Sequence, residues 1–284
     1  MLPPDQYELL DFGAGRKLER FGPLVLDRPA PAASDVAMAD PARWTSGNAR
    51  FTRHDAASGV WTLPAQLPTP WCLHYRSLVL ELQCTPSGAV GAYPEQVENW
   101  DWIERQVRRS GRVLKVLNLF AYTGASTLAA AAAGAEVVHV DAARPVVSWA
   151  RRNAVLSQLA DAPIRWIVDD ARKFVQRELR RGNEYHAVIL DPPTYGHGPK
   201  SEPWALPADL ADLLATCGRL TQRSRAFMLL TCHTPTIGPP ELEAMLADAL
   251  CGHCQSGVVA KTLAVRTRDG RRLPSGVVAR WPGG

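Results

Sequence analysis

Polar side chains that could do chemistry recur at the ends of five apolar stretches of the sequence. In chain order these ends are residues 118–126, 141, 169–170, 191–193 and 231–233. Three of the five supply aspartates, whose carboxylates accept hydrogen bonds from sugar hydroxyls or amines. Cys232 supplies a thiol, which can act as a nucleophile once it is deprotonated. A polar residue at the end of every stretch is difficult to explain by packing alone.

The spacing of these stretches predicts strands that alternate with helices. We expect strands over 113–120, 136–140, 164–168, 186–190, 226–231, 257–265 and 276–281. Apolar residues at helical spacing predict helices over 95–110, 125–133, 144–157, 171–181, 207–218 and 239–250. This alternation is typical of an α/β fold with a doubly wound, mostly parallel sheet. Ligands of such sheets bind beyond the carboxyl ends of the strands, where these polar residues fall.

The last two predicted strands are joined by a loop that contains Asp269 and Gly270. This loop is too short for the crossover of a dozen or more residues that two parallel strands require. One strand of the pair should therefore run antiparallel. Seven strands that end in an antiparallel hairpin form the Rossmann-like sheet of class I methyltransferases, whereas a dinucleotide dehydrogenase would be expected to end in parallel strands.

Residues 1–93 differ from the rest of the chain. They are rich in proline and tryptophan and show no sustained helical period. Alternation that runs up to Thr85, a turn at 86–88 and a return over 89–93 predict a β-hairpin. We therefore expect a small β-rich extension over 1–93 and a main domain over 94–284.

The loop after the first strand of the main domain favours one class of cofactor. It contains a single glycine, Gly124, and lacks the three glycines with which dinucleotide-binding proteins approach a pyrophosphate. S-adenosylmethionine has no phosphate, so one glycine can suffice. Asp141 follows the next strand, where a carboxylate can accept both ribose hydroxyls, and Asp169 or Asp170 could receive the adenine amino group. The alternative for any one of these acids is a helix N-cap.

Longer motifs resemble a known family. NLFAYTG at 118–124, ILDPPTYGHGPKSEPW at 189–204 and LLTCHTP at 229–235 are similar to S-adenosylmethionine-dependent methyltransferases. Within that family they look like the branch of the bacterial 23S ribosomal RNA cytosine-5 methyltransferases. The resemblance covers residues 90–284 and implies S-adenosyl-L-methionine as cofactor and ribosomal RNA as substrate. The N-terminal PUA module of that branch has no clear match in this chain.

The loop and the resemblance together predict which residues hold the cofactor. They are Glu95, Gln96, Asn118, Phe120, Tyr122, Thr123, Gly124, Asp141, Asp169, Asp170, Asp191 and Pro192. Glu95 and Gln96 resemble a short acidic-Gln motif of the branch. By that resemblance, their side chains would face the methionine end of the cofactor.

Two methyl acceptors fit the sequence. C5 of a cytosine becomes nucleophilic only after a thiolate adds to C6, and Cys232 resembles the nucleophile of the branch. The base that removes the C5 proton could be Asp191, Tyr195 or His233. An exocyclic amine would instead be held by the loop 191–195, with Tyr195 stacked on an extruded base. The alternative for Cys232 is a buried structural thiol.

Composition excludes several classes of protein. Of the 284 residues, 46% are hydrophobic and 21% are charged, which is ordinary for a globular protein and rules out a disordered chain. No apolar run is long enough to span a membrane and the start resembles no targeting peptide, so we expect a cytoplasmic protein. The net charge is +4, and arginines cluster at 105–112, 151–152, 177–181, 219–225 and 266–272. Such clusters could contact RNA phosphates or simply be solvated.

The sequence thus predicts an S-adenosylmethionine-dependent methyltransferase acting on cytosine C5 of ribosomal RNA. One alternative is an exocyclic-amine methyltransferase acting on a nucleic acid, protein or small molecule. A binding module without catalysis is opposed by the 191–193 loop and Cys232, and an oxidoreductase by the missing glycines. No metal site is expected, because Cys251 and Cys254 alone cannot complete one. The glycine-rich loop 196–200 is either a lid or a solvated loop, and the chain could act as a monomer or a homodimer.

Overall fold

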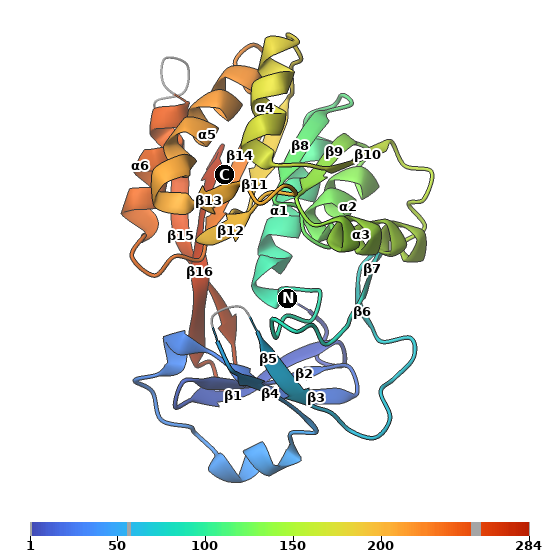
Figure 1. Ribbon diagram of the computed structural model, residues 1–284, viewed down its shortest axis with the longest axis vertical. Coiled ribbons are helices and arrows are strands. Elements are labelled where there is room, and N and C mark those ends of the chain that lie inside the picture. Colours follow the sequence, from blue (N-terminus) through green and yellow to red (C-terminus); the bar gives the residue numbers. More distant parts are fainter. Residues whose placement is uncertain (1, 56–57, 251–256, 284) are drawn as a thin grey trace. The chain divides into compact units, whose positions relative to one another are not determined.

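The computed structural model describes residues 2–55, 58–250 and 257–283 (Figure 1). Contacts divide the chain into two compact units, one formed by residues 1–97 and 264–275 and the other by 98–263 and 276–284. The first boundary lies close to the expected one, but residues 264–275 join the first unit rather than the second. The reason lies in two contacts, a β-bridge between Thr267 and Leu9 and a hydrogen bond of 2.6 Å from Arg271 to Asp11.

The first unit is rich in β-structure, as the sequence predicts. Its main sheet has the order β1-β2-β3-β4-β5, formed by Tyr7–Gly13, Arg16–Phe21, Leu24–Pro29, Ala49–Arg53 and Gly59–Thr62. A separate pair consists of β6 (Cys72–Tyr75) and β7 (Leu78–Glu81). Short 3₁₀ helices lie at Pro31–Ala33, Pro41–Ser46 and Pro94–Gln96.

The predicted hairpin near residue 87 differs in detail from the observed one. The turn is present, because the amide of Gly88 donates to the carbonyl of Thr85 at 3.0 Å. The alternating segment before it, however, does not form one strand. It turns back at Arg76, whose φ of 51° is left-handed, and so yields the short pair β6 and β7.

The second unit is built on a seven-stranded sheet with the order β10-β9-β8-β11-β14-β16-β15. The strands are β8 Lys115–Leu119, β9 Glu136–Asp141, β10 Ile164–Val168, β11 Ala187–Leu190, β14 Phe227–Cys232, β15 Val259–Arg266 and β16 Arg272–Trp281. The first five pair in parallel, whereas β16 is antiparallel to β14. The expected doubly wound sheet with a terminal antiparallel hairpin is therefore confirmed.

Helices cover both faces of this sheet (Figure 1). They are α1 Val97–Arg109, α2 Ala125–Ala132, α3 Arg144–Leu156, α4 Ala171–Arg180, α5 Leu206–Thr221 and α6 Pro239–Ala249. Apolar side chains of α4, α5 and α6 form one core cluster with the sheet, and those of α1 and α2 form another. A hairpin of β12 (Tyr195–His197) and β13 (Pro203–Ala205), which the sequence did not predict, lies between β11 and α5. Along the described residues, no helix is both long and apolar enough to cross a membrane.

Candidate active site

The polar residues singled out in the sequence meet at the carboxyl edge of the sheet in the second unit. Backbone hydrogen bonds continue the strand pairing into the loops there. The amide of Asp169 donates to the carbonyl of Asp141 at 3.0 Å, and that of Asp191 to the carbonyl of Leu119 at 3.4 Å. The parallel register therefore brings the ends of β8, β9, β10 and β11 together, as the sequence predicts.

The loop that follows β8 makes a sharp turn before α2. Phe120, Tyr122 and Gly124 all have left-handed backbone conformations, with φ of 54°, 49° and 89°. Residues other than glycine rarely adopt such backbone angles, so the surrounding structure must hold the loop in place. Asn153 of α3 does so by donating to the carbonyl of Thr123 at 2.9 Å.

Gly124 also permits a close approach between this loop and α3. A Cβ atom at that position would lie 3.1 Å from the Cβ of Ala150. The sequence predicted Gly124 as a cofactor-loop residue. The structure adds that the glycine lets the loop rest directly on α3.

Asp141 fits the predicted contact with ribose hydroxyls. Its two carboxylate oxygens accept from the amides of Tyr122 at 2.9 Å and of Ala143 at 3.0 Å. Burial nevertheless raises the pKa of Asp141, against the opposing effect of these hydrogen bonds. A partly desolvated carboxylate gains from further hydroxyl donors, because each oxygen can accept more than one hydrogen bond.

Asn118 supports the same loop from within the core. Its side-chain amide donates to the hydroxyl of Thr127 at 2.8 Å, and that hydroxyl is 2.9 Å from Nδ1 of His139. Asn118 is almost fully buried in this chain of polar groups. The three residues connect β8, α2 and β9 beneath the cofactor loop. A direct contact between Asn118 and the cofactor stays a prediction.

His139 is the titratable member of this buried chain. It is fully buried, and its Nε2 atom has no hydrogen-bond partner among the described residues. Burial, together with the charge of Arg151, lowers the pKa of His139 to about 3. The imidazole is therefore neutral at physiological pH.

Asp169 and Asp170 both have local partners. Asp170 is the N-cap of α4 and accepts from the amide of Lys173 at 3.0 Å, which is the alternative considered from the sequence. Asp169 forms an ion pair with Arg177. Contact of either residue with adenine stays a prediction.

A second cluster forms around Asp191 at the ends of β11 and β14. The hydroxyl of Thr231 donates to Oδ1 of Asp191, and Nε2 of His233 lies 3.2 Å from the same oxygen. Burial opposes ionisation, but the charge and hydrogen bond of His233 and the hydrogen bond from Thr231 outweigh it and lower the pKa of Asp191. The site thus contains a carboxylate that is ionised and oriented.

Gly276 is a site residue that the sequence did not reveal. A Cβ atom there would lie 2.7 Å from Nδ1 of His233 and 2.9 Å from the carbonyl oxygen of Cys232. Its φ of 111° is also left-handed. Because β16 pairs with β14, only glycine leaves room for His233 beside the strand. Without the antiparallel register, no signal in the sequence links the two residues.

Cys232 closes β14, as predicted, but its side chain is fully buried. It belongs to the apolar cluster that also contains Leu190 and Leu230, whereas its neighbour Thr231 reaches Asp191. Successive side chains of a strand point to opposite faces, which explains the difference. A nucleophilic role of Cys232 stays a prediction.

The loop after Asp191 connects the two halves of the site. Pro192 is buried, and the carbonyl of Pro193 accepts from the indole of Trp204 at 2.6 Å. The Trp204 ring in turn packs against that of Phe120 at a centroid distance of 4.9 Å. The 191–195 segment and the cofactor loop are therefore braced by one tryptophan.

The segment expected to be a lid or a solvated loop folds as the hairpin of β12 and β13. Tyr195 lies in this hairpin with 72% of its surface exposed, so its face is accessible for stacking. Glu202 at the turn pairs with Lys173 of α4 at 2.6 Å. An ion pair thus connects the hairpin to α4.

Two predicted cofactor residues belong to the first unit. Glu95 and Gln96 form the 3₁₀ helix at Pro94–Gln96 and belong to the first unit, and their contact with the cofactor stays a prediction. Cys251 and Cys254 lie outside the described residues. Within 2–55, 58–250 and 257–283, no cluster of three or more His, Cys, Asp or Glu residues could hold a metal ion.

Comparisons with known proteins give this site a family. A family model described as S-adenosylmethionine-dependent methyltransferase matches residues 42–253. The chain belongs to this family. A SAM-dependent methyltransferase from Agrobacterium tumefaciens, known as a crystal structure, is 36% identical, with a TM-score of 0.90 over 98% of this chain and 91% of that one. The protein is therefore a methyltransferase enzyme whose cofactor is S-adenosylmethionine.

More distant proteins resemble this chain either in structure or over part of its sequence. A structure described as a candidate SAM-dependent methyltransferase from Streptococcus mutans has a TM-score of 0.75 over 97% of this chain and 74% of its own, but at 14% identity it supports the fold alone. The ribosomal RNA large subunit methyltransferase K/L of Hahella chejuensis is 36% identical over 42% of this chain and 16% of its own length. A candidate ribosomal RNA large subunit methyltransferase from Methanocaldococcus jannaschii is 29% identical over 56% of this chain and 40% of its own length. The chain spans less than half the length of these curated relatives.

The site contains two clusters, one around Asp141 and one around Asp191. When bound, S-adenosylmethionine supplies an electrophilic methyl group. The turn at 120–124 and Asp141 are the residues that would hold the cofactor, with the carboxylate of Asp141 toward the ribose hydroxyls. Asp191, Thr231 and His233 form the second cluster, which holds an ionised carboxylate that can accept hydrogen bonds.

Replacing His139 by Gln should remove a specific pH dependence of stability. Below pH 6.5, the ordinary pKa of histidine, His139 binds a proton in the unfolded chain. In the folded protein, where its pKa is about 3, it does not. Neutral His139 therefore contributes to the free energy of unfolding above pH 6.5. This contribution is lost as the pH falls toward 3, by about 1.4 kcal/mol per pH unit. Urea unfolding of the wild type should therefore lose about 2 kcal/mol more than His139→Gln between pH 7 and pH 5.

The exposed His54 provides the control for this measurement. His54→Gln makes the same chemical change and should leave the pH dependence like that of the wild type. Equal pH dependence in His139→Gln and the wild type would show that His139 is not held neutral by burial.

Replacing Asp141 by Ala should weaken cofactor binding by about 1–3 kcal/mol, roughly 5- to 150-fold in Kd. The variant loses the acceptor for the ribose and the acceptor that holds the Tyr122 amide. Calorimetry with S-adenosylhomocysteine measures the change. Asp161→Ala, at an exposed position, removes the same charge and should bind like the wild type. Wild-type affinity in Asp141→Ala would refute the assignment.

Proposed function

We propose that this methyltransferase acts in the cytoplasm and modifies a base of large-subunit ribosomal RNA. Two curated relatives that match its sequence are named for that substrate. The arginine-rich composition, 27 Arg against 5 Lys, also suits contacts to phosphates and bases. RNA offers bases in unpaired loops that can be extruded into a pocket.

The contacts of Asp191 favour an exocyclic amine as the acceptor. Thr231 and His233 keep this carboxylate ionised and direct one of its oxygens. The carboxylate would accept an N–H of the amine, which orients the nitrogen lone pair toward the methyl group. Tyr195, exposed four residues along the same segment, would stack on the extruded base.

The transfer then balances as a single displacement. Bound S-adenosylmethionine would supply the methyl group to the nitrogen, and the electron pair of the broken carbon–sulfur bond would stay with the departing neutral thioether. The amine proton that becomes acidic passes to the Asp191–His233 pair, whose Nε2 and Oδ1 atoms are 3.2 Å apart. General-base groups placed in this way typically contribute about 10²- to 10⁴-fold.

Cytosine C5 is the second candidate acceptor. The support for it is the position of Cys232 at the end of β14, beside Thr231, and the resemblance of its motif. The full burial of Cys232 among apolar side chains weighs against it, because the thiolate would have to reach C6 of the base. The amine acceptor requires no such movement.

One pair of variants separates the two acceptors. Transfer of labelled methyl to large-subunit ribosomal RNA should fall by about 10²- to 10⁴-fold in Asp191→Asn, with cofactor binding retained. Cys232→Ala should transfer at nearly the wild-type rate, with a modest loss of stability from the small cavity.

Methylation at cytosine C5 would give a different result. If Cys232→Ala abolishes transfer and a 5-fluorocytidine RNA forms an adduct that survives denaturation, then C5 is the acceptor and the amine proposal is wrong. No transfer to any RNA by the wild type would remove RNA as the substrate.

A further inference from the structure

Three of the arginine clusters found in the sequence converge at the amino edge of the sheet in the second unit. Each cluster includes the end of a helix that leads into a strand: α1 into β8, α4 into β11 and α5 into β14. Arg112 donates to the carbonyl of Ser224 at 3.0 Å, and the amide of Tyr185 donates to the carbonyl of Leu220 at 2.9 Å. The first contact connects segments that are 112 residues apart in the chain, and the second connects residues 185 and 220. The converging edge lies at the opposite ends of the strands from Asp141 and Asp191.

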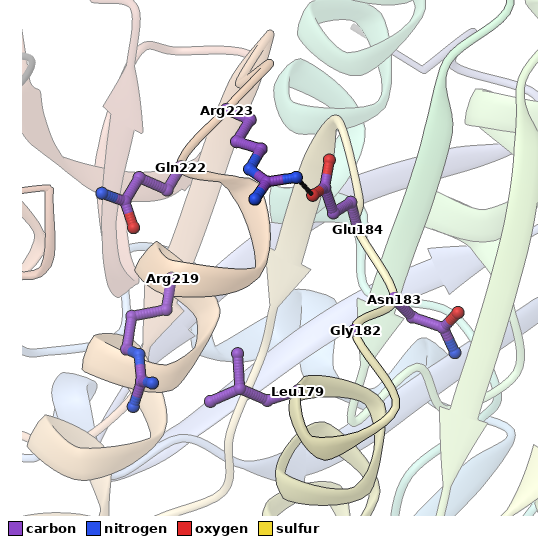
Figure 2. Close-up of a pocket in the computed structure, with 7 residues that line it drawn as sticks. All are labelled: Leu179, Gly182, Asn183, Glu184, Arg219, Gln222 and Arg223. Carbon is purple, nitrogen blue, oxygen red and sulfur yellow. Dashed lines mark hydrogen bonds and ion pairs between the residues drawn. The ribbon is translucent and has the colours of Figure 1, made fainter.

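A pocket of about 570 Å³ lies at this edge, between the ends of α4 and α5 (Figure 2). Its lining residues are Leu179, Gly182, Asn183, Glu184, Arg219, Gln222 and Arg223. Figure 2 shows Arg219, Gln222 and Arg223 extending from the α5 side, with Leu179 and the 182–184 segment across from them. The pocket thus combines two guanidinium groups with two side-chain amides. We call it the basic pocket.

The two arginines of the basic pocket are available for a ligand. Arg219 is exposed, and its side chain has no hydrogen-bond or ion-pair partner in the part of the chain that the structure describes. Arg223 has a side chain that is 82% exposed and pairs with the exposed Glu184 at 2.7 Å. Exposed ion pairs contribute little to stability, so a stronger anion can compete for Arg223.

The surroundings of the basic pocket add further positive charge. Arg181 is exposed, and its ion pair with the buried Glu178 is long, at 3.4 Å. On the neighbouring strands, burial and then the charges of Arg112 and Lys115 lower the pKa of His186. Arg112, Lys115 and Arg181 thus add positive charge around the basic pocket, and the carboxylates of Glu136 and Glu184 oppose them at His186.

Interaction with helix C-termini is the simpler explanation for arginines in such positions. Arg225 fits that explanation, because it donates to the carbonyl of Gly218 at 2.8 Å and to the hydroxyl of Thr221 at 2.9 Å. Arg223 instead pairs with a side chain across the pocket, and Arg219 lines the pocket wall. Capping therefore accounts for Arg225 but not for the other two.

We infer that the basic pocket binds a phosphate of the RNA backbone, remote from the base that is methylated. The planar guanidinium groups of Arg219 and Arg223 suit two-point contacts to phosphate oxygens. The side-chain amide of Gln222 suits a ribose 2′-hydroxyl next to that phosphate. The side-chain amide of Asn183 instead donates to Glu178 at 2.8 Å. The inference rests on the proposed RNA substrate. It adds that the substrate must be large or folded enough to reach both edges of the sheet.

The test compares Arg219→Gln/Arg223→Gln with the wild type in binding a transcript of large-subunit ribosomal RNA over a series of salt concentrations. Loss of one or two phosphate contacts should make the slope of log K against log salt shallower by about 1–2. Affinity at low salt should fall about tenfold or more, KM for the transcript should rise, and kcat should be nearly unchanged. A short oligonucleotide that fills only the active site should be methylated equally by both proteins.

Two further variants make the result specific. Arg151→Gln removes a charge from an exposed position on α3 and should leave the salt slope unchanged. Arg219→Lys/Arg223→Lys keeps the charge and should restore most of the slope. Calorimetry with S-adenosylhomocysteine confirms that each variant is folded.

The possible failures are distinguishable. If the wild type binds and methylates the transcript but the double Gln variant has the same salt slope and KM, the basic pocket is not an RNA site and the proposed function stands. If the wild type binds no RNA, the proposed function fails, and the inference fails with it.

Discussion

The hydrogen bonds that Thr231 and His233 direct at one oxygen of Asp191 are the interaction on which the candidate active site depends. They keep a partly buried carboxylate ionised, against the effect of its burial. They also require the ends of β11 and β14 to lie side by side, which the parallel pairing of the two strands provides. The antiparallel β16 adds Gly276, whose missing side chain leaves the space that His233 occupies. The terminal hairpin is thus a functional part of the sheet as well as its edge.

The cofactor side of the site is held by a similar arrangement. A turn with left-handed residues needs support from outside itself, and Asn153 and Asp141 provide it through contacts with backbone groups at 122–123. Beneath the turn, the buried chain of Asn118, Thr127 and His139 connects three elements. Polar groups in a core specify one arrangement when their hydrogen bonds are nearly all made. The sheet therefore presents two preorganised clusters, braced together by Trp204.

Much of this could be predicted from the sequence, because strand ends and loop lengths are local signals. Asp141 and Asp191 follow apolar stretches, and the short loop at 269–270 requires an antiparallel strand. Other features depend on contacts that are distant in sequence. The burial of Cys232 could not be predicted, because it depends on Thr231, the preceding residue of β14, facing Asp191 of another strand. The N-cap role of Asp170 could not be chosen in advance either, because its position suits an N-cap and a ligand contact equally. The convergence of arginines around the basic pocket likewise needs the wound topology.

We propose that Asp191, Thr231 and His233 orient an exocyclic amine of a large-subunit ribosomal RNA base for methylation. Nucleoside mass spectrometry of ribosomal RNA from cells with and without the protein tests this proposal. We expect one N-methylated base to disappear from the large-subunit RNA without the protein, and to return with the wild-type protein but not with Asp191→Asn. Loss of 5-methylcytidine instead would contradict the amine acceptor, and an unchanged set of modified nucleosides would contradict ribosomal RNA as the substrate.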